Sequence, residues 1–163
     1  MSCVSCKDTP KKEISSDPKP ESKELIIAIE FITNKQDVFL VMLDNIVVDE
    51  FQKKNIRIHE VVPPSSEPER IVAMFGANNI SNKIVINLGS ELKEIQFNSI
   101  EFTYGINSIK ITKDNYNDYL WSNKFIDFDE GDFSLKTKFV DGKHNPAIFS
   151  KQALTDFLKK GPK

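Results

Sequence analysis

The sequence predicts an all-β protein: an antiparallel β-sandwich, expected to be a jelly roll, with a short C-terminal helix. Apolar and polar residues alternate through most of residues 83–112, which is the period-2 pattern of half-buried strands. Phe (12 residues) far outnumbers Trp (1) and Tyr (3), and with many Ile and Val residues it suits pleated surfaces better than helices. About nine or ten short strands follow one another without intervening helices. A small barrel is the alternative architecture.

Each expected strand is an apolar or alternating run that ends at a turn signal. Residues 24–32 carry apolar side chains on both faces, so we expect this first strand to be buried on both sides. Residues 37–43 form a nearly continuous apolar run that is too short for a buried helix, and Asp44-Asn45 marks a break after it. Residues 46–51 fit a strand or a helical turn equally well. Further strands are expected at residues 55–62, 70–75, 83–88, 94–104 and 108–112, the last three as neighbours that supply much of the core.

The pattern changes beyond Thr112. Residues 115–123 hold two of the three tyrosines and the only tryptophan among polar residues, and we expect a loop there. Residues 125–128 and 133–139 predict a hairpin around the acidic turn 129–132, and residues 141–146 a turn-rich loop. The chain then predicts a helix with Ser150 as its N-cap and a stop at Gly161-Pro162. Its apolar stripe would consist of Phe149, Ala153, Leu154, Phe157 and Leu158.

Residues 1–23 differ in composition from residues 24–163, which we assign to the sandwich domain. After Cys6, Pro, Ser, Lys and Glu dominate, and such a segment predicts a disordered tether. Both cysteines of the protein, Cys3 and Cys6, lie in this segment. No further ligands or scaffold accompany them, as a redox or metal pair would require, and a disulfide between them would close only a tiny loop.

The segment Val4-Ser5-Cys6-Lys7-Asp8 resembles the lipobox junction of bacterial lipoproteins, and Lys7-Asp8 resembles the polar flank common in Bacteroidetes-type members. The resemblance implies lipid attachment at Cys6, with Cys3 as the competing position, and a lipid-anchored place in the cell envelope, at the outer membrane and facing either the periplasm or the surface. Cys3 stands where that family usually has Leu, and the apolar signal segment is missing. We therefore expect Met1 to lie inside the original signal sequence.

Residues 68–138 resemble the jelly-roll, carbohydrate-binding-like domains of bacterial surface proteins. The shared order is a strand, Asn87-Leu88-Gly89, a strand pair, a turn at Gly105 and a loop rich in aromatic residues and Asn. In that loop, Tyr116, Tyr119 and Trp121 could stack on sugar rings, and Asn117 and Asn123 could hydrogen-bond their hydroxyls. The alternative is that these aromatic side chains cap the open end of the core.

Signals of catalysis are sparse. The two histidines, His59 in a strand and His144 in a loop, have no motif around them, so we expect neither an enzyme nor a cofactor. Residues 127–132 gather carboxylates that could bind Ca²⁺, but their spacing does not fit an EF-hand loop and a solvated turn explains them equally well, so we expect no metal. A formal net charge of −2 disfavours nucleic-acid binding.

These observations favour a membrane-tethered, non-enzymatic lipoprotein whose sandwich binds a glycan or another cell-surface component. The alternative is a protein–protein interaction module with no carbohydrate ligand. An enzyme with an unrecognised acidic site is the third hypothesis.

Overall fold

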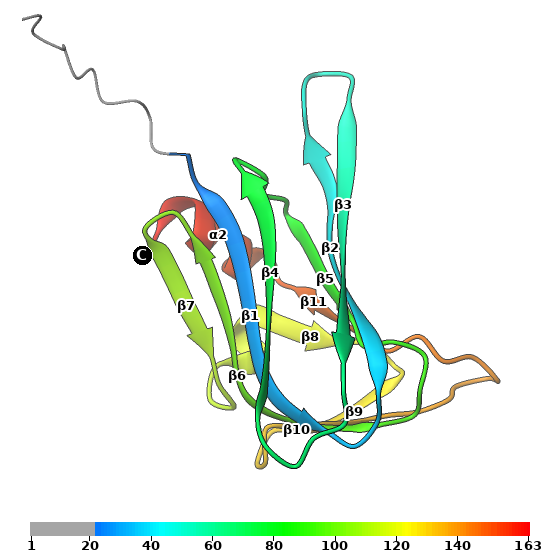
Figure 1. Cartoon of the computed structure of the whole chain (residues 1–163). Coiled ribbons are helices and arrows are strands. Elements are labelled where there is room, and N and C mark those ends of the chain that lie inside the picture. Colours follow the sequence, from blue (N-terminus) through cyan, green and yellow to red (C-terminus); the bar gives the residue numbers. More distant parts are fainter. Residues whose placement is uncertain (1–21) are drawn as a thin grey trace, which may run out of the picture.

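The computed structural model describes residues 22–163, which fold into two antiparallel sheets that pack face to face (Figure 1). Sheet A has the strand order β4-β1-β6-β10-β9, with β7 also paired to β6. Its strands are β1 (Glu24–Thr33), β4 (Glu69–Ala77), β6 (Glu94–Tyr104), β7 (Asn107–Ile111), β9 (Ile126–Asp129) and β10 (Ser134–Thr137). Sheet B has the order β3-β2-β5-β11-β8. Its strands are β2 (Asp37–Val47), β3 (Lys53–Val62), β5 (Lys83–Asn87), β8 (Leu120–Ser122) and β11 (Ala147–Ser150). The helices are α1 (Tyr116–Tyr119) and α2 (Gln152–Lys160).

This architecture confirms the predicted all-β sandwich with a short C-terminal helix. The first four strands of the chain form two nested pairs: β2 pairs with β3 in sheet B, and β1 pairs with β4 in sheet A. The next two strands extend the two sheets, because β5 pairs with β2 and β6 pairs with β1. In turn, β11 pairs with β5 and β10 pairs with β6. The chain thus wraps both sheets together, as in a jelly roll.

The core lies between the sheets and consists of the inward-facing residues of the long strands. Leu25, Ile27 and Ile29 of β1 are buried, and Phe31 packs against Phe39 of β2 with ring centroids 5.3 Å apart. The outer side of β1 is less enclosed than predicted: Ala28 is buried there, whereas its other apolar residues are half-buried. Strand β1 has a neighbour on each side within sheet A, but the outer face of the sheet stays partly open to solvent at Ile26 and Ile32.

Residues 83–112 do not form three neighbouring strands as predicted. Strand β5 lies in sheet B, and β6 and β7 lie in sheet A. The loop between β5 and β6 crosses from one sheet to the other and is fixed by a buried ion pair. The Nζ atom of Lys93, whose side chain is 0% exposed, donates to Asp37 Oδ2 (2.5 Å) and to the carbonyl oxygens of Leu88 (2.5 Å) and Glu91 (2.7 Å).

Two segments differ from the predicted secondary structure near their turns. The break predicted at Asp44-Asn45 is a bulge inside β2, where Asn45 takes a positive φ of 59° and the pairing with β3 shifts register. Residues 46 and 47 therefore belong to the strand. Residues 115–123, predicted as a loop, contain the single turn of α1 and the short strand β8.

The C-terminal helix is shorter than predicted. Phe149 and Ser150 belong to β11, and Lys151 is the N-cap of α2. The Ser150 hydroxyl accepts a hydrogen bond from the Ile84 N–H (3.0 Å) instead of capping the helix. Leu154 and Leu158 are buried as expected, whereas Ala153 is exposed. The stop is confirmed, because the helix ends at Gly161 with a positive φ of 84°.

The predicted hairpin of residues 125–139 is confirmed as β9 and β10. Asp129 Oδ1 accepts hydrogen bonds from the N–H groups of Gly131 (2.9 Å) and Asp132 (3.2 Å), which closes the turn. This hairpin extends sheet A beyond β6 and supplies most of the site described next.

Candidate functional site: a polar pocket on sheet A

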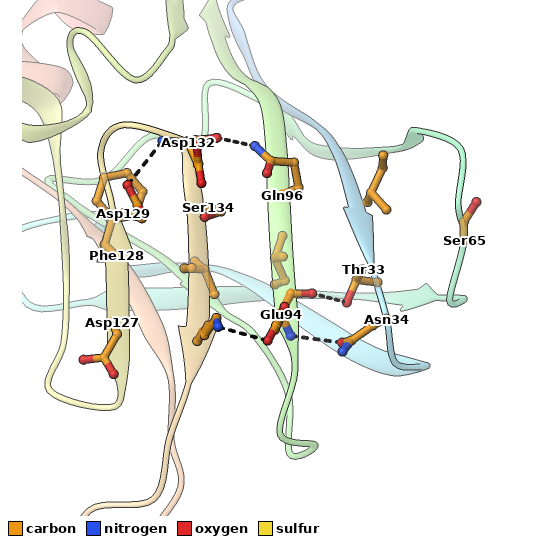
Figure 2. Close-up of a pocket in the computed structure, with 14 residues that line it drawn as sticks. Thr33, Asn34, Ser65, Glu94, Gln96, Asp127, Phe128, Asp129, Asp132 and Ser134 are labelled. Atoms are coloured by element: carbon orange, nitrogen blue, oxygen red, sulfur yellow. Dashed lines mark hydrogen bonds and ion pairs between the residues drawn. The ribbon is translucent and has the colours of Figure 1, made fainter.

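A cavity of about 630 Å³ opens on the outer face of sheet A, where β6, β10 and β9 lie side by side (Figure 2). The strand pairing sets two rows of outward-facing residues across its floor. Gln96, Ser134 and Asp129 form one row, and Glu94, Lys136 and Asp127 the other. Thr33, Asn34, Ser65 and Asp132 complete the polar lining. We call these ten residues the polar pocket.

Backbone and side-chain contacts hold these groups in place. Gln96 Nε2 donates to the carbonyl oxygens of Asp132 and Phe133, which ties β6 to the hairpin turn. The N–H of Glu94 donates to Asn34 Oδ1 (3.0 Å), and the Glu94 carboxylate lies 3.3 Å from Lys136 Nζ. Seven of the ten residues stand on strands, whose pairing preorganises the backbone of the pocket, and the other three, Asn34, Ser65 and Asp132, lie in the adjoining turns and loops.

The electrostatics of the polar pocket are acidic. Four carboxylates, those of Glu94, Asp127, Asp129 and Asp132, face the single lining ammonium of Lys136. Asp127 also pairs with Lys138 at its edge (2.5 Å). Carboxylate oxygens accept hydrogen bonds, while the Asn34 amide and the Ser134 hydroxyl can also donate them. This mixture suits a neutral ligand rich in hydroxyl groups better than an anion.

The two histidines lie away from the pocket. His59 is exposed on β3 opposite Leu40 in sheet B, and His144 packs on Phe139 with ring centroids 5.0 Å apart. Neither histidine lines the cavity. Among residues 22–163 no group of three His, Cys, Asp or Glu side chains has a geometry that could hold a metal ion.

Tyr116, predicted to stack on a sugar, lies inside the protein with 1% of its surface exposed. Its ring stacks on Phe128 at a centroid distance of 4.1 Å, and its hydroxyl hydrogen-bonds Ser122 Oγ (2.6 Å). Burial raises the pKa of the Tyr116 hydroxyl well above its ordinary range, although the Ser122 bond lowers it slightly. Tyr116 therefore backs the polar pocket from the core side, through Phe128.

Tyr119 and Trp121 lie on two other surfaces. Tyr119 is half-buried and lines a separate cavity of about 390 Å³ beside α2, together with Phe157. Trp121 on β8 is 45% exposed, and its ring stacks on Phe149 at 4.4 Å with 14° between the planes. Across sheet B, Phe149 lies opposite Val85, and Val85 opposite Met42. We call these four residues the aromatic row.

The two predicted asparagines serve local structure. Asn123 Oδ1 accepts from the N–H groups of Phe125 (3.2 Å) and Ala147 (3.3 Å), and its Nδ2 donates to the Asn145 carbonyl (2.8 Å). Asn117 is exposed and donates to Glu130 Oε1. The structure thus distributes the predicted set over the core, the helix cavity and sheet B. The predicted lipid-attachment residues Cys3 and Cys6 lie outside the described residues.

The class of protein that these features define is an antiparallel β-sandwich with a preorganised polar pocket. Comparison with protein-family models, with curated proteins and with solved structures finds no match for the chain. Within residues 22–163, neither helix has the length and apolar character needed to cross a bilayer.

Proposed function

We propose that this protein is a lipid-anchored, non-enzymatic binding module of the bacterial cell envelope and that the polar pocket binds a glycan. The observation that carries the proposal is the double row of fixed carboxylate, amide and hydroxyl groups on sheet A. Neighbouring sugar hydroxyls can donate to both oxygens of one carboxylate, and such charge-assisted bonds are strong. The cavity volume lies within the range of about 300–1,000 Å³ typical of small-molecule sites.

The charge of the pocket narrows the ligand class. An acidic sugar would place a further negative charge beside the four carboxylates of the pocket, and the repulsion would lower its affinity. Neutral or amino sugars avoid that cost. We therefore expect neutral or amino glycans to bind and uronic or sialic acids to be rejected.

A second candidate is a protein partner docked on the aromatic row. The observation that favours it is Trp121, which remains 45% exposed on an edge strand and continues an apolar line across sheet B. Exposed aromatic residues are enriched at the centres of protein interfaces.

A glycan array probed with the purified full chain tests the first candidate and the location of its binding site. We expect Glu94→Ala and Asp127→Ala to abolish binding with little change in melting temperature, because both residues are exposed. The matched control is Glu101→Ala, which removes a carboxylate from the same face of β6 at its other end. Loss of binding in Trp121→Ala, with the pocket variants unaffected, would move the site to the aromatic row.

The proposed anchor rests on the sequence around Cys6. Palmitate labelling in cells, using the gene from its natural start, tests it with Cys6→Ser and Cys3→Ser. We expect Cys6→Ser alone to abolish labelling. No labelling of the unsubstituted protein would remove the anchor from the proposal.

A further inference from the structure

The β2–β3 hairpin and the β6–β7 turn both lie at the end of the sandwich where the described chain begins (Figure 1), and together they carry four exposed apolar side chains. The β2–β3 hairpin stands clear of the sheets there, and Phe51 at its tip is 93% exposed. Val47 (69%) and Val48 lie just before it, and Ile106 (89%) forms the turn between β6 and β7. Large apolar side chains held in solvent at one end of a domain are candidates for contact with a partner or a membrane.

The hairpin tip is an ordered turn. Asp49 Oδ1 accepts from the N–H groups of Phe51 (2.8 Å) and Gln52 (2.9 Å), and the Val48 N–H donates to the Gln52 carbonyl (3.0 Å). The Asp49 carboxylate is therefore occupied by the backbone, while Phe51 is held outward in solvent.

The N-terminal segment joins the sandwich at this same end. The Asn78 N–H donates to the Lys23 carbonyl (2.6 Å), which binds the start of β1 to the turn after β4. The Lys23 side chain passes under the β6–β7 turn, where a Cβ on Gly105 would lie 2.9 Å from Lys23 Cγ. From Cys6 to β1 the chain can span at most about 60 Å. A lipid on Cys6 would thus keep the sandwich within that distance of the bilayer, with the tether attached at this end.

A cavity of about 460 Å³ between the hairpin and the β4–β5 loop is lined by positively charged side chains. Lys53, Lys83 and Lys159 line it, with Val47 at its wall. The acidic group inside it is Asp44, 3.6 Å from Lys83 Nζ. Acidic groups also lie at this end: Asp49 and Glu50 in the hairpin turn, Asp156, which pairs with Lys160, and Glu24, whose Oε1 accepts from the Gly76 N–H. The three lysines can bind lipid phosphates, while the apolar side chains at the two turns can insert among the acyl chains.

We propose that this end, comprising the hairpin tip, the β6–β7 turn and the lysine cavity, lies on the lipid bilayer. The inference rests on the proposed lipid anchor and gives the tethered domain a fixed orientation. Strand β1 runs from Glu24 at this end to Thr33 beside the polar pocket. The pocket, with Asn34 and Ser65 among its lining residues, therefore lies at the end of the sandwich away from the membrane, where a glycan can reach it.

A single-tryptophan experiment tests this orientation. The full chain carries Cys3→Ser and Trp121→Phe, and Cys6 is coupled to a maleimide lipid in vesicles of phosphatidylcholine and phosphatidylglycerol (3:1). Phe51→Trp then reports on the hairpin tip. Phe139→Trp is the matched control, because Phe139 is also exposed (57%) but follows β10, on the side of the polar pocket.

We expect the Phe51→Trp protein to show blue-shifted emission that brominated lipids quench, and the Phe139→Trp protein to show neither effect. Adding Lys53→Glu and Lys159→Glu should reduce the quenching at Phe51→Trp. Equal quenching at both positions, or no quenching at Phe51→Trp, would overturn the proposal. The chemical coupling replaces cellular lipidation, so failure of the proposed anchor would appear in the palmitate labelling and not here.

Discussion

Replacing Lys93 by Met removes the ammonium group that fixes the crossing from sheet B to sheet A. Met fills a similar volume, so the change isolates the charge from the packing of the stem. The side chain of Asp37, only 7% exposed, would lose its ion partner, and the carbonyl groups of Leu88 and Glu91 would lose a donor.

Breaking one side of a buried ion pair costs about 3–5 kcal/mol. We expect a value near the lower limit, about 3 kcal/mol, because Asp37 keeps hydrogen bonds from the N–H groups of Val38 and Glu91 (both 2.8 Å). For a domain of roughly 140 residues, this loss corresponds to a fall in melting temperature of about 10 °C. Stabilities of about 5–15 kcal/mol leave the variant folded.

Thermal unfolding followed by circular dichroism measures the change, and a double-mutant cycle with Asp37→Asn identifies its origin. We expect Asp37→Asn/Lys93→Met to be less destabilised than the sum of the single variants, because the two groups interact directly. A melting temperature of Lys93→Met within about 2 °C of the native protein, equivalent to less than about 1 kcal/mol, would refute the buried pair.

Three further predictions follow from the same packing. Burial raises the pKa of Asp37, but hydrogen bonds from Lys93 and from the N–H groups of Glu91, Val38 and Ser90 outweigh it and leave the pKa below its ordinary value of 3.8. The stabilising contribution of the Asp37 carboxylate is thus present above the unfolded-state pKa and is lost as the pH falls through the folded-state pKa. In a pH series, the difference in melting temperature between the native protein and Lys93→Met should therefore narrow below about pH 4. Gly89→Ala should lower the free energy of unfolding by at least about 2 kcal/mol in urea titrations. The reason is that Gly89 has a φ of +84° and the new Cβ would collide with the Asp37 carboxylate. An unchanged urea midpoint of unfolding would contradict that contact. Tyr116→Ala should cost about 3–5 kcal/mol and Trp121→Ala only about 1 kcal/mol, since one ring is buried and the other is largely a surface stack; similar losses in both would contradict their placement.

Local patterns predicted most strands because alternation depends only on which face of a strand is buried. Ile95 and Phe97 face the core while Glu94 and Gln96 face solvent, as their spacing indicates. The same pattern does not specify which strands pair. Strand β5 joins β2 rather than β6, and the loop after it is held by the bond from Lys93 to Asp37, more than fifty residues away in the sequence.

Strand β11 was missed for a related reason. Ser150 has the character of a helix N-cap, and the apolar residues around it fit a helical stripe. What makes 147–150 a strand is its pairing with β5 on one side and β8 on the other, which places Phe149 between Val85 and Trp121. Neither partner is close enough in sequence to leave a local signal.

The polar pocket shows the same limit. The hairpin of β9 and β10 was predictable from two short runs around an acidic turn, but its docking beside β6 was not. Asp127 and Glu94 share the pocket through Lys136, which lies between them on β10. Sequence reasoning instead selected the most aromatic segment, where Tyr116 proved to be core and Trp121 part of a different surface.

Nuclear magnetic resonance can locate a bound glycan residue by residue and so test whether the polar pocket binds it. The ¹⁵N-labelled full chain is titrated with the strongest array ligand, and the amide shifts are mapped on the structure. We expect saturable shifts at Gln96, Asp127 and Ser134 and none at Trp121 or Phe149. Shifts confined to the aromatic row, or no ligand among neutral and amino glycans, would overturn the proposed glycan site.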